Sequence, residues 1–159
     1  MARLRIKFRR RKDKKTDYKA RLAMLKSGKP RLVIRKSNKY LIVEIITSRN
    51  AQDSVVCHAN SKELVKFGWK YSFKNTPAAY LTGFLIGTKA KKIKINEAIL
   101  DIGINISTKG SRIYSVLKGA LDAGLDIMHS KDVLPSEARI KGEHLKHKLN
   151  VGEFRDKIK

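Results

Sequence analysis

The segment from Pro30 to Ser61 constrains the fold of this chain more than any other feature. It contains three short runs rich in β-branched and aromatic residues, separated by turn-forming residues. The runs span residues 32–34, 40–46 and 54–59. Runs of this length and spacing predict an antiparallel meander of three strands. Both alternating sets of side chains in the middle run are mostly apolar, so we expect a sheet that is covered on each face.

Downstream of the meander the pattern alternates between helix and strand. Asn75-Thr76-Pro77 is a typical helix start, which predicts a helix over residues 78–89. The apolar run 97–103 predicts a fourth strand, and a helix beginning near Ser111 separates it from a possible fifth strand at 125–128. A strand–helix–strand order predicts parallel pairing with a right-handed crossover. The predicted fold class is therefore α/β, with a mixed sheet of meander and parallel strands and helices on both faces.

The helices also suggest how they pack. Thr16 is a suitable N-cap for a helix whose Tyr18, Leu22 and Leu25 form one apolar stripe, which we expect to lie in the core. In the helix over residues 78–89, small residues recur every four positions at Ala79, Gly83 and Gly87. Because each interior glycine costs roughly 1 kcal/mol, this strip predicts a close approach, which we expect to be to the sheet.

Charge indicates the kind of partner. The 159 residues contain 37 Lys and Arg against 14 Asp and Glu, a net charge of +23. Residues 1–39 alone hold 17 of the basic residues and two acids. Such an excess repels itself unless a polyanion neutralises it, which indicates nucleic acid or an anionic membrane. No apolar face broad enough for membrane insertion accompanies the charge, and no run is long enough to span a bilayer, so we expect no membrane partner.

The basic residues divide the chain into three parts. Residues 1–15 are predicted to form an RNA-binding arm that is disordered until bound, because few apolar residues offset its ordering entropy. Residues 16–130 are predicted to form the core domain, and residues 131–159 a polar helical segment on the surface. Arg21 continues the basic track of the arm. The candidate RNA-binding residues of the arm are Arg3, Arg5, Lys7, Arg9, Arg10, Arg11 and Lys12.

Three places in the core domain are further candidates for RNA contact. The first is the turn of the first hairpin, with Lys36, Ser37, Asn38 and Lys39, and the second is Arg49 in the following turn. The third is the helix start with Lys109, Ser111 and Arg112, where backbone N–H groups favour one phosphate. These last residues only imitate a P-loop, because Gly110 follows Lys109 where a Ser or Thr would have to stand.

Catalysis and metal binding have weak support in the sequence. Cys57 and His58 are neighbours on a predicted strand, so their side chains point to opposite faces and do not suggest a shared metal. The lone cysteine is consistent with a reducing compartment. Asp101 and Asp126 end two predicted strands, and paired carboxylates there leave open an RNA-processing, metal-dependent nuclease as the alternative function. We expect a binding protein without enzymatic activity, cofactor or small-molecule substrate.

Ordered blocks along nearly the whole chain resemble one family, large-subunit ribosomal protein eighteen in its archaeal and eukaryotic-type form. The blocks include Phe8-Arg9-Arg10-Arg11, Ser27-Gly28-Lys29-Pro30-Arg31, Gly68-Trp69-Lys70, Asn75-Thr76-Pro77-Ala78-Ala79-Tyr80, Ala98-Ile99-Leu100-Asp101-Ile102-Gly103, Lys109-Gly110-Ser111-Arg112 and Leu117-Lys118-Gly119-Ala120-Leu121-Asp122-Ala123-Gly124. The resemblance implies a compact α/β domain, with helices on both sides of a mixed sheet, preceded by a basic arm. The sequence departs from the family pattern at Cys57-His58, Met128-His129 and Ile93-Lys94-Ile95. These departures affect the expected geometry of local turns.

The resemblance also implies partners and a location. A member of this family binds 5S rRNA and helps attach it to the large-subunit (23S-type) rRNA in the central protuberance of the ribosome. The implied partners are therefore these two RNAs and neighbouring large-subunit ribosomal proteins, and the implied location is cytoplasmic, in the large ribosomal subunit.

Overall fold

The computed structural model describes residues 7–50, 52–145 and 149–158. The described elements run in the following order. They are α1 (Arg9–Lys12), α2 (Tyr18–Lys26), β1 (Arg31–Lys36), β2 (Leu41–Arg49), β3 (Gln52–Asn60), the 3-10 helix η1 (Ser61–Phe67), α3 (Thr76–Lys92), β4 (Ile99–Asp101), α4 (Arg112–Asp122), the 3-10 helix η2 (Lys131–Val133), α5 (Glu137–Lys141) and α6 (Val151–Ile158).

The sheet has four strands in the order β3-β2-β1-β4. β1 pairs antiparallel with β2, and β2 antiparallel with β3, which confirms the predicted meander. β4 pairs parallel with β1, so the predicted mixed sheet is also confirmed. β4 is shorter than predicted because the chain turns at Gly103, which has φ +59° and donates its N–H to the Asp101 carboxylate. Residues 125–128 form no strand, and Asp126 makes a single parallel bridge with Glu97.

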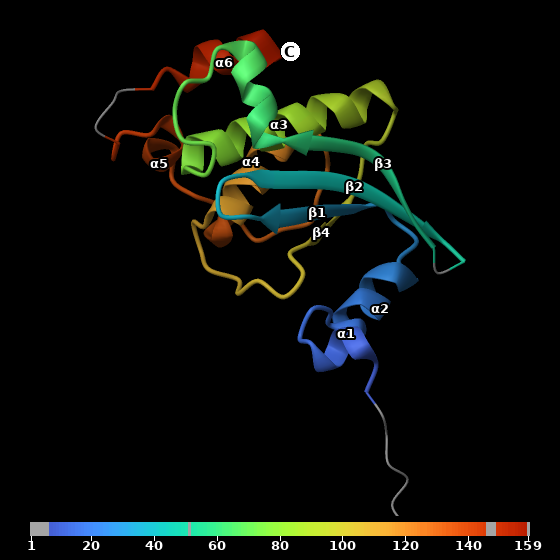
Figure 1. Ribbon diagram of the computed structural model, residues 1–159. Coiled ribbons are helices and arrows are strands. Elements are labelled where there is room, and N and C mark those ends of the chain that lie inside the picture. Colours follow the sequence, from blue (N-terminus) through green and yellow to red (C-terminus); the bar gives the residue numbers. More distant parts are fainter. Residues whose placement is uncertain (1–6, 51, 146–148, 159) are drawn as a thin grey trace, which may run out of the picture.

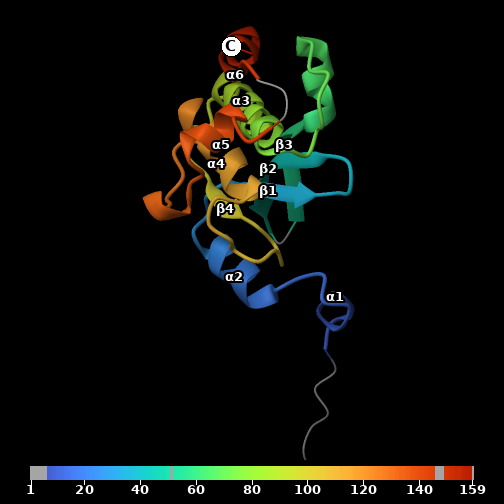
Figure 2. The same ribbon diagram turned by 90° about the vertical axis from the view of Figure 1, so that its left-hand side faces the viewer.

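Helices α3 and α4 cover one face of the sheet and enclose the main core (Figures 1 and 2). Leu81 and Ile86 of α3 and Leu117 of α4 are fully buried against the sheet residues Leu32 and Ile45. The C-terminal helices α5 and α6 lie against this helical layer. They add buried Ile140, Val151 and Ile158 to the core, so the segment predicted to be a polar surface element also contributes apolar packing.

The strip of small residues on α3 faces helix α4, so the prediction that it faces the sheet is wrong. A Cβ atom added to Gly83 would lie 2.0 Å from the carbonyl oxygen of Val116, and one added to Gly87 would lie 2.5 Å from the Cβ of Ala123. Gly119 of α4 has the reciprocal position, with the Tyr80 carbonyl oxygen 2.0 Å from its would-be Cβ. Because both helices carry glycine at the contact, the backbones of α3 and α4 meet without intervening side chains.

Helix α2 lies on the other side of the molecule, together with α1 (Figure 1). Its N-cap is Asp17, not the predicted Thr16, because the Asp17 carboxylate accepts hydrogen bonds from the N–H groups of Lys19 and Ala20. No residue of α2 is buried, and Leu22 is 56% exposed. The prediction that the apolar stripe of this helix lies in the core is therefore wrong. Helices lie on both sides of the sheet, but among the described helices only α3 and α4 seal a face.

Within the described ranges, no helix combines the length and the apolar character that crossing a membrane would require.

Candidate nucleic-acid interface

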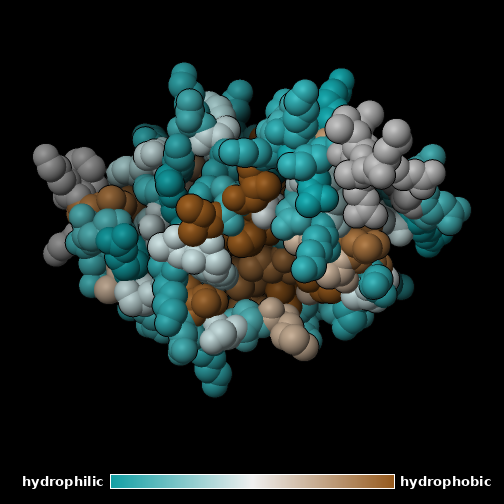
Figure 3. All heavy atoms as spheres, turned by 90° about the horizontal axis from the view of Figure 1, so that it is seen from below, coloured by the Kyte–Doolittle hydropathy of each residue, from teal (hydrophilic) through white to brown (hydrophobic). Residues whose placement is uncertain are grey.

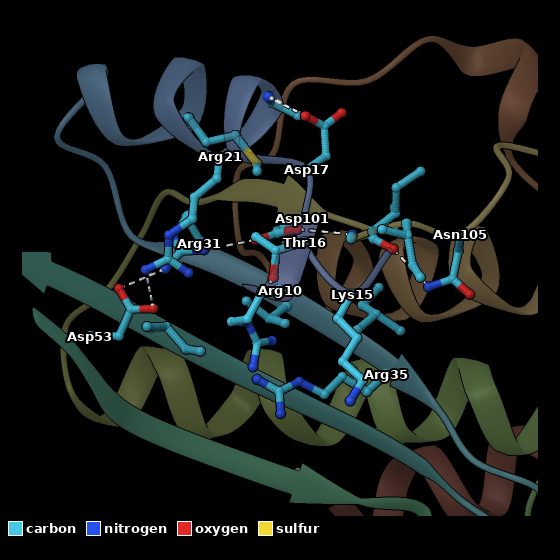
Figure 4. Close-up of a pocket in the computed structure, with 18 of the residues that line it drawn as sticks. Arg10, Lys15, Thr16, Asp17, Arg21, Arg31, Arg35, Asp53, Asp101 and Asn105 are labelled. Atoms are coloured by element: carbon cyan, nitrogen blue, oxygen red, sulfur yellow. Dashed lines mark hydrogen bonds and ion pairs between the residues drawn. The ribbon is translucent and has the colours of Figure 1, made fainter. Parts of the chain in front are cut away.

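A groove of about 520 Å³ lies between the α1–α2 segment and the sheet face that α3 and α4 leave uncovered. Strand alternation directs Arg31, Val33 and Arg35 of β1 toward this groove, whereas Leu32 and Ile34 contribute to the core behind the sheet. Figure 4 shows the groove side chains in front of the strands, with α2 along one side. Figure 3, which shows the molecule from below, has apolar side chains at the bottom of a hollow that hydrophilic side chains surround.

The acidic side chains of the groove are all engaged with protein groups. Asp53 contacts two guanidinium groups, with its oxygens 2.7 Å from Arg21 Nη2 and 2.9 Å from Arg31 Nη2. Asp101 Oδ2 lies 2.8 Å from Arg31 Nη1. Asp17 caps α2. The acids of the groove thus offset Arg21 and Arg31, which already lie within it.

The remaining basic side chains of the groove are exposed. Arg35 lies 3.5 Å from Glu44, and Lys15 lies 3.9 Å from Asp13, but exposed pairs of this kind contribute little, typically 0 to about 1 kcal/mol. Arg10 donates from Nε to the hydroxyl of Thr16, a neutral group that does not offset the charge of the guanidinium. With Lys36 at the end of β1, these residues make the mouth of the groove cationic. We call Arg10, Lys15, Arg35 and Lys36 the groove cations.

The charge state of Asp53 follows from opposing effects. Burial by itself raises the pKa of this carboxyl, but hydrogen bonds from Ser48, Arg21 and Arg31 together outweigh burial and hold the pKa below its ordinary value. Asp53 is therefore ionised at neutral pH, and its negative charge stays within the protein as the counter-ion of Arg21 and Arg31.

Two of the predicted contact regions lie at one edge of the molecule. The first hairpin turn follows β1, and the loop that leads to α4 follows β4. Because β1 and β4 are parallel, both segments leave the sheet at the same edge. Lys36, Ser37, Asn38 and Lys39 are exposed, and Ser37 is bonded to Tyr40 across the turn. The structure thus brings this turn and the helix start near Lys109 to one edge.

The helix start itself only partly matches the predicted phosphate site. Lys109 is exposed, but Arg112 donates to the backbone carbonyl of Lys74 at 3.1 Å. Ser111 precedes α4 without capping it through its side chain, and its buried Oγ has no hydrogen-bond partner among the described residues. Lys109 is therefore the residue of this set whose charge is presented to solvent.

Arg49 is separated from the hairpin turn. It ends β2, whereas the turn precedes the same strand. A strand of nine residues spans roughly 27 Å at about 3.4 Å per residue. Arg49 therefore lies at the opposite end of the sheet. Arg21, another candidate, directs its guanidinium to Asp53 and so joins α2 to the sheet.

The basic arm is described only in part, since Arg3 and Arg5 lie outside the described residues. Lys7 and the α1 residues Arg9 to Lys12 are exposed. Residues 9–12, which belong to the segment predicted to be disordered until bound, form helix α1. The ring of Phe8 also contacts that of Tyr18, with centroids 5.3 Å apart.

Sequence reasoning did not select Lys15, Arg31, Arg35 or Asp53 as site residues. For Arg35 a signal was present, because side chains alternate between the two faces of a strand, which places Arg35 on the same face of β1 as Arg31 and Val33. For Asp53 no local signal exists. Its two arginine partners lie 22 and 32 residues away in sequence, and only the fold brings them together.

The alternative nuclease site is not formed. Asp101 ends β4, whereas Asp126 pairs with Glu97, four residues earlier on the same segment. That offset corresponds to roughly 13 Å of extended chain, and Asp101 is already bound to Arg31. In the part of the chain that the structure describes, no three His, Cys, Asp or Glu side chains are placed to hold a metal ion.

Comparison with known proteins identifies the class. Residues 2–98 and 90–130 match the family described as "Ribosomal large subunit proteins 60S L5, and 50S L18". The chain is 57% identical over 143 residues to large ribosomal subunit protein uL18 of Korarchaeum cryptofilum, covering 90% of this chain and 73% of that protein. It is 51% identical over 144 residues to uL18 of Caldivirga maquilingensis, covering 90% and 70%.

These matches define a structural protein of the large ribosomal subunit, not an enzyme. Within that class, the chain belongs to the family of 60S L5 and 50S L18 proteins and is similar to its archaeal uL18 members. The resemblance seen in the sequence blocks is thereby confirmed, as is the location in the cytoplasmic large subunit. Two observations argue against the alternative nuclease function: Asp101 and Asp126 do not form a shared site, and the family consists of structural ribosomal proteins.

Proposed function

We propose that this protein binds 5S rRNA and helps to attach it to the large-subunit rRNA in the central protuberance. The observation that carries RNA binding is the uncovered sheet face, where every acid of the groove is engaged by a protein group and the groove cations are exposed. The choice of 5S rRNA and of the central protuberance rests on the family resemblance.

The binding surface has two parts. The first consists of the groove cations, the hairpin turn 36–39 and Lys109, which lie on the groove side and on the edge where β1 and β4 end. The second consists of the other Lys and Arg residues of the arm, which neutralise phosphates. RNA of this kind is recognised by its shape, its 2′-hydroxyls and its unpaired loops, so we expect contacts to the backbone and to unstacked bases. Arg49 contacts RNA only if the RNA extends to the opposite end of the sheet.

The test measures the affinity of the full chain for 5S rRNA transcripts at several salt concentrations. Each phosphate contact contributes roughly 0.7 to 0.9 to the log–log slope, so we expect a slope of several units. Deleting residues 1–12 removes seven Lys and Arg residues and should lower the slope by as much as about 5, while circular dichroism shows an unchanged fold.

An unrelated structured RNA of the same length is the control for specificity. Binding of both RNAs with equal affinity at near-cellular salt would contradict the assignment of 5S rRNA. A slope near zero would contradict the electrostatic basis of binding, and an unchanged slope after the deletion would remove the arm from the interface.

A further inference from the structure

A series of ion pairs joins helix α2 to the sheet (Figure 4). At its centre is Arg31 of β1, whose side chain is 3% exposed. Its guanidinium binds Asp101 of β4 at 2.8 Å and Asp53 of β3 at 2.9 Å. The other oxygen of Asp53 accepts from Arg21 of α2 at 2.7 Å. One carboxylate therefore connects a helix on the molecular surface to three strands of the sheet.

The two ends of this series of ion pairs differ in the contacts that hold them. On the sheet side, Asp53 also accepts from the hydroxyl of Ser48 on β2, and Asp101 accepts from the backbone N–H of Gly103, so the position of Arg31 is fixed from both flanks. On the other side, Arg21 stands on a helix with no buried residue. The sheet thus presents Asp53 as a fixed anchor for Arg21.

Apolar packing does not replace this anchor. Leu22 of α2 is 56% exposed, and the other residues of the helix are at best half-buried. Among the hydrogen bonds and ion pairs of the described residues, the Arg21–Asp53 pair is the one that joins a side chain of α2 to the sheet. The orientation of α2 over the groove therefore depends on Asp53.

The groove cations Arg10 and Lys15 depend on α2 in turn. Arg10 donates from Nε to Thr16, directly before the helix, and the Lys15 N–H donates to the Arg10 carbonyl at 2.8 Å. The Phe8 ring rests on Tyr18, the first residue of α2. Segment 8–26 is thus connected internally, and its position relative to β1 fixes the distance from Arg10 and Lys15 to Arg35 and Lys36.

We propose that Asp53 is a positioning residue for RNA binding: it holds α2 on the sheet so that the groove cations from the N-terminal segment and from β1 face the same RNA backbone. The inference rests on the proposed function. It assigns to an acidic residue a favourable effect on the affinity for a polyanion. Simple Coulomb attraction has the opposite sign, since removing a negative charge from the protein strengthens its attraction to RNA.

The positioning role and simple Coulomb attraction therefore predict opposite changes in RNA affinity when the charge of Asp53 is removed, and the experiment tests this difference. The full chain with Asp53→Asn is compared with Asp132→Asn, an exposed position on η2 where the same change of one charge is made away from the groove. For Asp53→Asn we expect affinity for 5S rRNA to fall several-fold and the salt slope to fall by about 1 to 2, the contribution of one or two lost phosphate contacts. Asp132→Asn should bind as tightly as the wild type or more tightly.

A second pair of variants approaches the contact from the helix. Arg21→Gln breaks the connection but leaves Arg31 paired with both acids, so the sheet is preserved, and Lys19→Gln removes the same charge from an exposed position of α2. We expect a larger loss of affinity and of slope for Arg21→Gln. Hydrogen exchange without RNA supplies an independent readout, with faster exchange of the α2 amides in Asp53→Asn and Arg21→Gln than in the two control variants. Restoration of wild-type slope by Asp53→Glu would support the role of the carboxylate.

The outcomes separate this inference from the proposed function. If the wild type binds 5S rRNA and Asp53→Asn binds at least as tightly as Asp132→Asn with the same slope, Asp53 does not position the interface. If the wild type does not bind 5S rRNA, the proposed function fails, and the positioning role fails with it. A circular dichroism melt of each variant detects global unfolding, in which case Arg21→Gln decides the question.

Discussion

Helices contact the two faces of the sheet by different physical means. On one face, α3 and α4 bring backbone against backbone through Gly83 and Gly119 and enclose an apolar core. On the other face, α2 buries no residue and is joined to the sheet by the Arg21–Asp53 ion pair. The first face provides the stability of the domain, whereas the second leaves room and charge for a ligand.

The difference also predicts different responses to solvent. Close packing of apolar groups is insensitive to moderate salt, but partly exposed ion pairs are screened as ionic strength rises. Salt therefore weakens the attachment of α2 and the attraction to RNA together. The helix-covered face, by contrast, keeps its structure over the same range.

The largest effect is expected from filling the contact between α3 and α4. In Gly83→Ala the new Cβ would lie 2.0 Å from the Val116 carbonyl oxygen, so the helices must separate. Overpacking against backbone of this kind should destabilise the domain by about 3 kcal/mol or more, measured by urea unfolding. The control is Gly152→Ala in α6, where the nearest atom is Asn150 Oδ1 at 3.4 Å. Equal stability of the two variants would show that the helices are not in close contact.

An intermediate effect is expected at alkaline pH from Tyr80, a buried tyrosine of α3. Burial and a hydrogen bond to Asp122 raise its pKa to about 12 from an ordinary value of 10.0. Because the pKa is higher in the folded state, the associated stability is fully present below pH 10 and is lost as pH rises toward 12. The loss should approach about 2 kcal/mol. Urea unfolding of the wild type and Tyr80→Phe between pH 9 and about 12 checks this, and parallel curves would contradict it.

The smallest effect is expected from the apolar residues of α2. Leu22→Ala should change the free energy of unfolding by no more than about 0.5 kcal/mol, because the side chain is already 56% exposed. Leu81→Ala is the matched substitution on the helix-covered face, where the side chain is fully buried, and should cost about 2 to 5 kcal/mol. A large cost for Leu22→Ala would mean that α2 is packed and not only ion-paired.

Local sequence patterns predicted those features that depend on neighbouring residues. The meander 31–60 follows from the spacing of three β-rich runs, and the helix start at Asn75 follows from its capping side chain, which accepts from the Ala78 N–H. The excess of basic residues, and their concentration before residue 40, required no structure at all.

Partners distant in sequence could not be predicted in this way. The glycine strip of α3 predicted that some element approaches closely, but it did not predict that this element is α4. The contact of Gly119 with α3 can be recognised only once the two helices are packed together. The apolar stripe of α2 looked like a core stripe, because periodicity does not show whether a partner surface exists. Asp101 and Asp126 end neighbouring segments in the sequence pattern, yet Asp101 ends β4 whereas Asp126 pairs with Glu97, before β4 begins.

The sequence by itself determined most of the helices and strands, the mixed sheet and the polyanionic nature of the partner, since these follow from hydrophobic periodicity, capping residues and net charge. Only the tertiary structure decided which face is sealed, which arginines already have acidic partners and which basic residues share a groove. The physical reason is that burial and ion pairing depend on distances between residues far apart in the chain. Asp53, Arg21 and Arg31 acquire a joint role only when β1, β3 and α2 are assembled.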